Sequence, residues 1–420
     1  MFVLDSQGWE LDSHSRTHYR MFVQFTPVYI NHCDNVRQHM KIIDPNPVTA
    51  FGCTLVKELF SNGTDNVAVS PYSIWTALAT TECATIKDSD ASKEMSELLR
   101  YDCVAAVDIA ERNEQLCKWY VDYRKKMEVK DNVIKLHVVN AIFTRDNLNR
   151  DFKQACERFG AHTMPLTDKD SINNFVARNT EKLIPNILKE EPKGDTVLVN
   201  AVYFQASWTQ MFQQNQTIMS DFRLFNGNSV RCRMMTKKNV DIELSITRTY
   251  QMVKLDYGTE KEFSAFIAVP HGNANSQNEL NGVVETLFGS DTSWSNATSL
   301  LKLQKVTCLR IPSFSAEGGV DDLEKYMKNH KVTHVFAPGG LHDLTDTHND
   351  YISEISHKAI IKVNEAGTTA AAVTVVQMTR SICRDPEFIC DRPFIFVVAH
   401  NATKTILFAA RVNNVVETAR

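Results

Sequence analysis

The sequence lacks the short motifs that mark common catalytic and metal-binding sites. Its 420 residues contain no GxSxG elbow, no HExxH pair, no P-loop and no GxGxxG loop. The ten cysteines stand singly, without a CxxC pair or a zinc-type cluster of Cys and His. Such spacing argues against a dense disulfide framework and against a metal site. We therefore predict that the protein is not an enzyme and binds neither a cofactor nor a metal.

Charge of one sign and long apolar runs are also scarce. The formal net charge is only −4, and no block of like charges occurs, which argues against a dedicated binder of nucleic acid or of a membrane surface. No apolar run approaches the roughly 18 residues that a membrane span needs. The first residues carry charges where an export signal needs an apolar stretch. Against that, four Asn-x-Ser/Thr sequons suit a secreted glycoprotein: Asn62, Asn215, Asn296 and Asn401.

Periodicity divides the chain into a short extension and one large domain. Residues 1–47 show no sustained pattern and end in the helix breakers Pro45 and Pro47. From Val48 onward apolar residues recur at helical spacing, and Pro71 directly after Ser70 predicts the start of a second helix. We predict a poorly ordered extension over residues 1–47 and a single domain over residues 48–420.

The rest of the chain predicts a mixture of helices and strands. SKEMSELLRYD, NEQLCKWYVDYRKKMEV and Ser171–Leu188 are predicted helices. Runs rich in Val, Ile, Phe or Tyr predict strands, and these are Val133–Phe143, Thr196–Phe204, Tyr250–Tyr257, Phe263–Pro270 and the C-terminal FIFVVAH and TILFAARV. Asn226-Gly227 predicts a two-residue hairpin turn. The fold class is therefore α+β, with at least one large mixed sheet.

One segment, Glu365–Arg380, has an unusual composition. EAGTTAAAVTVVQMTR carries no charge and no proline between its ends, and no glycine after Gly367. As a strand it could be buried on both faces, and its small residues could slide between existing strands without clashing. The polar loop that follows offers a basic residue where a trypsin-like protease could cut. From the pattern alone, an ordinary strand followed by a surface turn is the favoured interpretation of the segment.

Six blocks of the sequence resemble the serpins, a family of serine protease inhibitors. VNEAGTTAAAV (residues 363–373) resembles the inhibitory hinge of that family, and FICDRPFIFVV (residues 388–398) resembles its C-terminal signature. The other blocks, in family order, are SPYSI (70–74), VNAVYFQASW (199–208), RIPSFS (310–315) and SHKAIIKVNE (356–365). The resemblance implies an α+β serpin fold with three β-sheets, about nine helices and an exposed reactive-centre loop over about residues 365–390.

The resemblance also implies a mechanism and assigns roles to residues. The target protease attacks the loop as a suicide substrate and forms an acyl-enzyme, after which the cleaved hinge inserts into the main sheet of the metastable fold and distorts the protease. The hinge comprises Glu365, Ala366, Gly367, Thr368, Thr369, Ala370, Ala371 and Ala372. Conformational control falls to Ser70, Ser73, Asn200 and His357 beneath the sheet opening, and to Trp208 beside Glu365.

The position of the scissile bond depends on where the count starts. Counted from Gly367, the commonest family spacing puts the cut after Ser381, whereas counting back from Phe394 puts it after Arg380. We choose Arg380-Ser381, because the acidic specificity pocket of trypsin-like proteases attracts arginine. Cleavage after Ser381 or Arg384 remains an alternative.

The resemblance sets expectations for partners and location. We expect a monomer that binds a trypsin-like serine protease. Five cations lie near the helix that binds heparin in some serpins, but acids are interleaved with them, which favours a solvated face over a glycosaminoglycan site. These cations are Lys118, Arg124, Lys125, Lys126 and Lys130. A non-inhibitory serpin-fold binding protein and a cysteine-protease inhibitor are the alternative functions. The family and the sequons favour an extracellular location, and the lack of a visible signal peptide keeps a cytoplasmic one open.

Overall fold

The part of the chain that we describe comes from a computed structural model and covers most of the predicted domain. It comprises residues 46–61, 65–101, 112–127, 129, 131–271, 277–319, 323–367 and 385–415. All of these residues belong to one compact unit, Met40–Arg420. The predicted extension lies outside the described residues up to position 45. No helix in the described ranges is both long enough and apolar enough to cross a membrane.

The helices begin where the sequence supplies capping residues. Helix α1 (Pro47–Phe60) starts at a proline, and the side chain of Asn46 accepts a hydrogen bond from the backbone N–H of Thr49 at 3.0 Å. Ser70 caps helix α2 (Pro71–Glu82) in the same way. The described residues hold seven further α-helices: α3 (Asp90–Leu98), α4 (Arg112–Lys126), α5 (Arg150–Phe159), α6 (Lys169–Asn179), α7 (Gln277–Phe288), α8 (Ser293–Ser299) and α9 (Leu323–Asn329).

Helix α6 is shorter than the sequence predicts. The expected helix over Ser171–Leu188 ends at Asn179, and the next residues turn away, with Glu181 and Lys182 at positive φ. The buried side chain of Asn173 explains the reversal, because its carbonyl oxygen accepts hydrogen bonds from the backbone N–H groups of residues 187 and 188. The prediction of a helix over residues 180–188 was therefore wrong: a tertiary contact outweighs local helix propensity.

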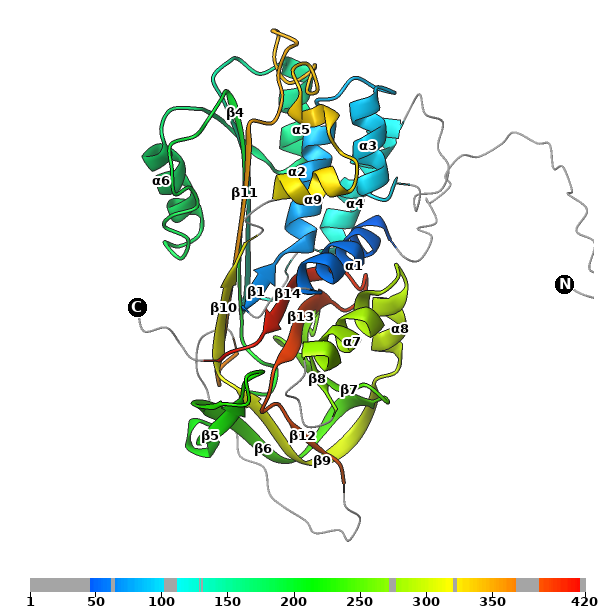
Figure 1. The fold of residues 1–420 in the computed structure, drawn as a ribbon, viewed down its shortest axis with the longest axis vertical. Coiled ribbons are helices and arrows are strands. Elements are labelled where there is room, and N and C mark those ends of the chain that lie inside the picture. The colour runs from blue at the N-terminus through cyan, green and yellow to red at the C-terminus, as the bar shows by residue number, and fades with distance from the viewer. Residues whose placement is uncertain are drawn as a thin grey trace, which may run out of the picture. The chain divides into compact units, whose positions relative to one another are not determined.

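A five-stranded sheet contains the strands that matter most for function. Its order is β10 (Phe314–Gly318), β11 (Glu354–Val363), β4 (Thr196–Ala206), β2 (Ile134–Thr144) and β3 (His162–Pro165). Strands β10–β11 and β4–β2 pair antiparallel, whereas β11–β4 and β2–β3 pair parallel. In Figure 1, β4 and β11 run side by side, with α6 on one side of them and α2 on the other.

Both faces of strand β4 are buried, as its unbroken apolar sequence requires. Leu198, Val202 and Phe204 belong to the larger of two hydrophobic cores, the one that includes helix α2. The alternate residues Val197 and Val199 belong to a smaller core that includes helix α6. The period of two along a strand thus divides the side chains of β4 between the two layers of helices. Asn200 falls on the side of the larger core.

A nine-stranded sheet forms the rest of the β-structure. It contains β1 (Val67–Val69), β14 (Ile406–Val412), β13 (Phe394–His400), β8 (Phe263–Pro270), β7 (Tyr250–Asp256), β6 (Ser229–Ile246), β9 (Lys302–Pro312) and β12 (Glu387–Ile389) in this order, with β5 (Ile218–Arg223) beside β6. Strand β6 spans 18 residues and pairs successively with β5, β9 and β7, so it joins two of the three expected sheets. A hairpin at Asn226-Gly227 connects β5 to β6 as predicted, but its connection is longer than the predicted two-residue turn, because residues 224–228 separate the paired ends Arg223 and Ser229.

Candidate functional site

The parallel pair of β4 and β11 separates before either strand ends. Its register runs from Glu354 opposite Val197 to Ile360 opposite Tyr203. Strand β11 continues to Val363 and β4 continues to Ala206, but within the described residues no ladder joins these last residues to each other. The two strands are therefore hydrogen-bonded along most of their length and open at one end.

A tight turn occupies the open end of this pair. The backbone N–H of Asn364 donates to the carbonyl of Gly367 at 2.8 Å, and the N–H of Gly367 donates back at 3.1 Å. Gly367 also forms an antiparallel bridge with Ser207, just past the end of β4. Its φ of +124° suits only glycine, and an added Cβ would lie 2.3 Å from the carbonyl oxygen of Ala206. The chain therefore reverses direction at this turn, so that Gly367 lies antiparallel to Asn364, just past the end of β11.

Trp208 holds the turn from one side. Its indole N–H donates to the carbonyl of Asn364 and its backbone N–H donates to the carbonyl of Ala366, both at 3.0 Å. The indole ring stacks on Tyr257 with a centroid separation of 4.4 Å and an interplanar angle of 11°. The sequence predicts that Trp208 lies beside Glu365, and the structure brings both residues to the same turn.

Glu365 holds the turn from the other side with a buried carboxylate. Its oxygen accepts hydrogen bonds from the Thr217 hydroxyl at 2.8 Å and from the Arg233 guanidinium at 2.7 Å, although the Arg233 side chain is itself 55% exposed. Burial alone would raise the pKa of the Glu365 carboxyl, but these hydrogen bonds and the positive charge of Arg233 outweigh it and hold the pKa below its ordinary value. The carboxylate is thus ionised and bound to Thr217, just before β5, and to Arg233 of β6, both of which are distant in sequence.

A second cluster of polar side chains lies under the closed part of the ladder. The backbone N–H of Ser70 donates to Nε2 of His357 at 3.2 Å, so the imidazole proton is on Nδ1 and points to the side-chain oxygen of Asn200. The amide of Asn200 donates in turn to the carbonyl of Ser73 at 3.1 Å. Burial lowers the pKa of His357 to about 3, which keeps the ring neutral. All four residues that the sequence assigns to this cluster are brought together.

Several hydrogen-bond partners of Asn200 and Glu365 are not predicted from the sequence. Asn140 of β2 lies directly opposite Asn200 and accepts a hydrogen bond from its amide. A signal for Asn140 is present, because VVNAIF and LVNAVYF each place one asparagine within an apolar run. No comparable signal marks Thr217 or Arg233, which are far from Glu365 in sequence.

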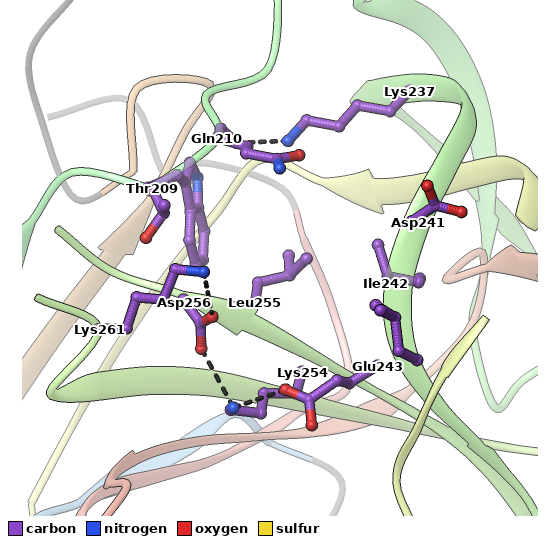
Figure 2. Close-up of a pocket in the computed structure, with 12 residues that line it drawn as sticks. Thr209, Gln210, Lys237, Asp241, Ile242, Glu243, Lys254, Leu255, Asp256 and Lys261 are labelled. Atoms are coloured by element: carbon purple, nitrogen blue, oxygen red, sulfur yellow. Dashed lines mark hydrogen bonds and ion pairs between the residues drawn. The ribbon is translucent and has the colours of Figure 1, made fainter. Parts of the chain in front are cut away.

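A surface pocket of about 490 Å³ adjoins the turn, and Trp208 forms part of its wall (Figure 2). Lys254 pairs with Glu243 at 2.6 Å and with Asp256 at 3.3 Å, so the charges on one wall satisfy each other. On the opposite wall the ammonium of Lys237 donates to a backbone carbonyl, and burial lowers its pKa to about 8. The pocket therefore presents paired charges on one wall and a desolvated lysine on the other.

Of the remaining predicted residues, some lie outside the described part of the chain and the others differ in exposure. The hinge residues Thr368–Ala372 and the bond Arg380-Ser381 lie outside the described residues, as do Asn62 and Lys130. Asn215 and Asn296 are exposed, whereas the side chain of Asn401 donates hydrogen bonds to the Lys261 carbonyl and the Ser264 hydroxyl. On α4, Lys118, Lys125 and Lys126 are exposed and Arg124 is half-buried.

Comparisons with known proteins agree with the fold. Residues 46–415 match the family model described as Serpin (serine protease inhibitor). Glia-derived nexin of Mus musculus is 30% identical over 372 residues, covering 83% of this chain and 87% of that protein. The solved structure of Tengpin, a thermophilic serpin in its native state, aligns with a TM-score of 0.75 at 24% identity over 94% of this chain and 98% of that one. Human thyroxine-binding globulin aligns with a TM-score of 0.76 at 21% identity over 88% and 98%.

Proposed function

Because this chain belongs to the serpin family of serine protease inhibitors, we propose that it traps a trypsin-like serine protease as a suicide substrate cut between Arg380 and Ser381. In this mechanism the serine of the target attacks the carbonyl carbon of Arg380 and forms an acyl-enzyme, while the new amino group leaves on Ser381. The cleaved hinge then inserts as a strand between β4 and β11. The protein itself supplies no catalytic group.

The observation that carries this proposal is the turn at the open end of a parallel strand pair. Gly367 forms antiparallel bridges both to Asn364, just past the end of β11, and to Ser207, just past the end of β4. A strand that continued from Gly367 between the two would replace one parallel ladder by two antiparallel ladders. Antiparallel pairs are slightly more stable per residue, and each added strand buries new surface and forms new hydrogen bonds. Insertion is therefore favourable once cleavage frees the far end of the segment.

The register of the turn supports the predicted role of the hinge residues. With Gly367 opposite Asn364, a continued strand would set Thr368 opposite Val363 and Ala370 opposite Ile361. Both β11 residues are buried in the larger core, and residues directly opposite in an antiparallel pair share a face. The alternate residue Thr369 would face the exposed side beside Lys362. Small residues would thus enter the crowded face of the sheet.

The first experiment tests trapping and the cleavage site together. The purified protein is incubated with trypsin at near-equal molar ratio, resolved on a denaturing gel, and the released C-terminal peptide is sequenced. A stable band at the summed mass, with a new N-terminus at Ser381, supports the proposal. Cleavage without that band overturns it for trypsin. A gain in thermal stability of the cut chain then shows that insertion still occurs, whereas no gain favours the non-inhibitory alternative. Trapping of a papain-like protease alone favours the cysteine-protease alternative.

A pair of hinge substitutions tests insertion by register. Thr368→Arg would place a charge opposite buried Val363, so we expect the inhibitor to become a substrate, with cleavage retained and the covalent band lost. Thr369→Arg is the matched control, because the same side chain would lie beside exposed Lys362 and the covalent band should persist. Loss of the band in both variants, or in neither, contradicts the proposed register.

A further inference from the structure

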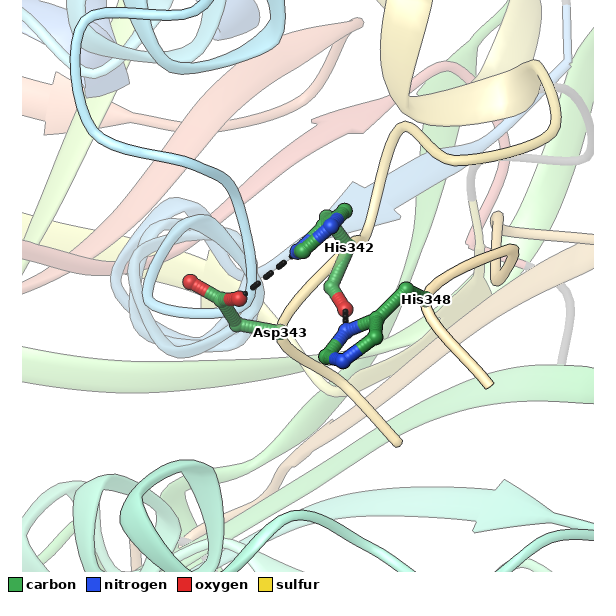
Figure 3. Close-up of side chains that lie close together, drawn as sticks. All are labelled: His342, Asp343 and His348. Carbon is green, nitrogen blue, oxygen red and sulfur yellow. Dashed lines mark hydrogen bonds and ion pairs between the residues drawn. The ribbon is translucent and has the colours of Figure 1, made fainter. Parts of the chain in front are cut away.

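Three side chains that can bind a metal gather on the loop that precedes β11. His342, Asp343 and His348 each offer a ligand atom, and these atoms all lie within 4.8 Å of one another (Figure 3). The sequence predicts no metal site, because its Cys and His residues lack zinc-finger spacing, and a His-Asp pair followed by a second His does not match that pattern. The loop itself brings the two histidines together.

Hydrogen bonds already orient these side chains. His348 Nδ1 lies 2.9 Å from the carbonyl oxygen of His342, and because a carbonyl only accepts, Nδ1 carries the proton. The lone pair of His348 is therefore on Nε2, free to bind a metal. Metal-binding histidines commonly use their other ring nitrogen in this way. His342 Nδ1 lies 2.8 Å from Asp343 Oδ1, a separation close to that of two ligands on one ion.

We propose that His342 Nδ1, Asp343 Oδ1 and His348 Nε2 bind a zinc ion. Two imidazoles and one carboxylate suit Zn²⁺, whereas Ca²⁺ and Mg²⁺ prefer oxygen ligands alone. In the bound form the His342 proton moves to Nε2, and the ion takes the place of the hydrogen bond to Asp343. Water completes the tetrahedral shell.

The side chains have the freedom to close around the ion. The His342 and Asp343 side chains are 36% and 49% exposed. The imidazole rings of His342 and His348 stack at 4.2 Å with an interplanar angle of 18°, and because the nitrogen lone pairs lie in the ring planes, this stack must open before both rings bind one ion. Bonds of about 2.0–2.1 Å require ligand atoms closer than 4.8 Å, so rotation of the exposed side chains must bring them together. The backbone need not move far, because both histidines are on one short loop.

The surrounding contacts define what the ion would stabilise. The N–H of Asp343 donates to the Ala84 carbonyl at 2.8 Å, and the N–H of Leu341 donates to the Asp350 carbonyl at 2.9 Å. At the end of the loop Ser353 Oγ accepts from the N–H of Thr196 at 3.0 Å, which joins it to the start of β4. Zinc would cross-link this loop and stabilise the folded state, whether or not the protein inhibits a protease.

The test is a calorimetric titration of the full chain with ZnCl₂. We expect one saturable site whose affinity falls at least about tenfold in the double variant His342→Gln/His348→Gln. The matched control His14→Gln/His18→Gln removes two histidines of the N-terminal extension and should bind like the wild type. The Tm of wild type and control should rise with zinc, and that of the double variant should not. Equal binding in the double variant, loss in the control, or no binding by the wild type overturns the proposal.

A second measurement keeps the test decisive if the double variant fails to fold. Co²⁺ replaces zinc in the wild type and reports tetrahedral nitrogen and oxygen ligands by its visible absorption. Asp343→Asn keeps the size of the side chain but removes the anionic ligand, so the Co²⁺ affinity should drop at least about tenfold. Unchanged cobalt spectra and affinity in Asp343→Asn contradict the assignment of the carboxylate.

Discussion

The β4–β11 pair is held by different chemistry at its middle and at its open end. At the middle, Asn200 and His357 are almost fully buried and neutral, and each hydrogen bond joins two uncharged groups. At the open end, an ionised Glu365 is held by Arg233, whose side chain is half exposed. Neutral buried networks are insensitive to salt, whereas an ion pair with one exposed partner is partly screened by it. The open end is therefore the part of the pair that solvent conditions can loosen.

The largest effect on stability is expected from a substitution in the buried polar cluster at the middle of the β4–β11 pair. Asn200→Ala leaves His357, Ser73 and Asn140 without their shared partner, so the free energy of unfolding should fall by about 3 kcal/mol. Unfolding in urea measures this loss. The control Asn174→Ala removes an exposed amide on α6 and should change stability by less than about 0.5 kcal/mol. A similar small change in both variants would show that the cluster does not hold the ladder.

Acid should weaken the middle through His357. The folded-state pKa of about 3 lies below the ordinary 6.5, so the unfolded chain binds a proton that the folded chain does not. Stability contributed by neutral His357 is thus complete above pH 6.5 and is lost as pH falls towards 3. At pH 5 the loss is about 2 kcal/mol.

The variant His357→Gln isolates this contribution, because glutamine retains a donor and an acceptor but does not titrate. Its stability should fall less than that of the wild type between pH 7 and pH 5, in chemical unfolding at each pH. Parallel pH profiles would falsify the role of His357.

The open end should respond to charge and salt by a smaller amount. Glu365→Gln keeps an acceptor for Thr217 but removes the ion pair with Arg233, at a cost of about 1 kcal/mol in low salt. The difference from the wild type should shrink at 1 M salt. Asn200→Ala serves as the comparison, because its cost should not depend on salt. An equal salt dependence of both variants would remove the distinction between the two regions.

Trp208→Phe should have the smallest effect. Phenylalanine keeps an aromatic ring to stack on Tyr257 but lacks the indole N–H that binds the Asn364 carbonyl. The expected loss is about 1 kcal/mol or less, seen as a slightly lower Tm. Tyr203→Phe, within strand β4, is the control for loss of one polar group elsewhere. A Trp208 effect as large as that of Asn200→Ala would mean that the turn, and not the middle, dominates stability.

Much of the fold is predictable because its signals are local. Ser70 and Pro71 mark the start of α2, and Asn226-Gly227 marks the hairpin before β6, since capping and turn chemistry depend on neighbouring residues. The end of α6 is not predictable in this way, because Asn173 ends the helix by binding residues that return to it through the fold.

The candidate site is likewise predictable only in part from the sequence. The family blocks predict Trp208, Glu365 and the Ser70 cluster. The structure brings Trp208 and Glu365 to one turn, and it brings the members of the Ser70 cluster together under the closed part of the ladder. Arg233 and Asn140 do not follow, because the fold brings the Arg233 side chain to Glu365, and strand pairing sets Asn140 opposite Asn200. The His342 and His348 pair depends on one loop conformation, which no propensity specifies.

The turn at Asn364–Gly367 also has a kinetic consequence. The first step of forming a hairpin is slow. The reversal of the chain fixes several dihedral angles, and the conformational entropy is lost before hydrogen bonds offset it. Here that step is complete in the uncut protein, since both hydrogen bonds of the turn are present. Strand addition would then proceed as zippering from an existing nucleus, at a rate set by how fast β4 and β11 part.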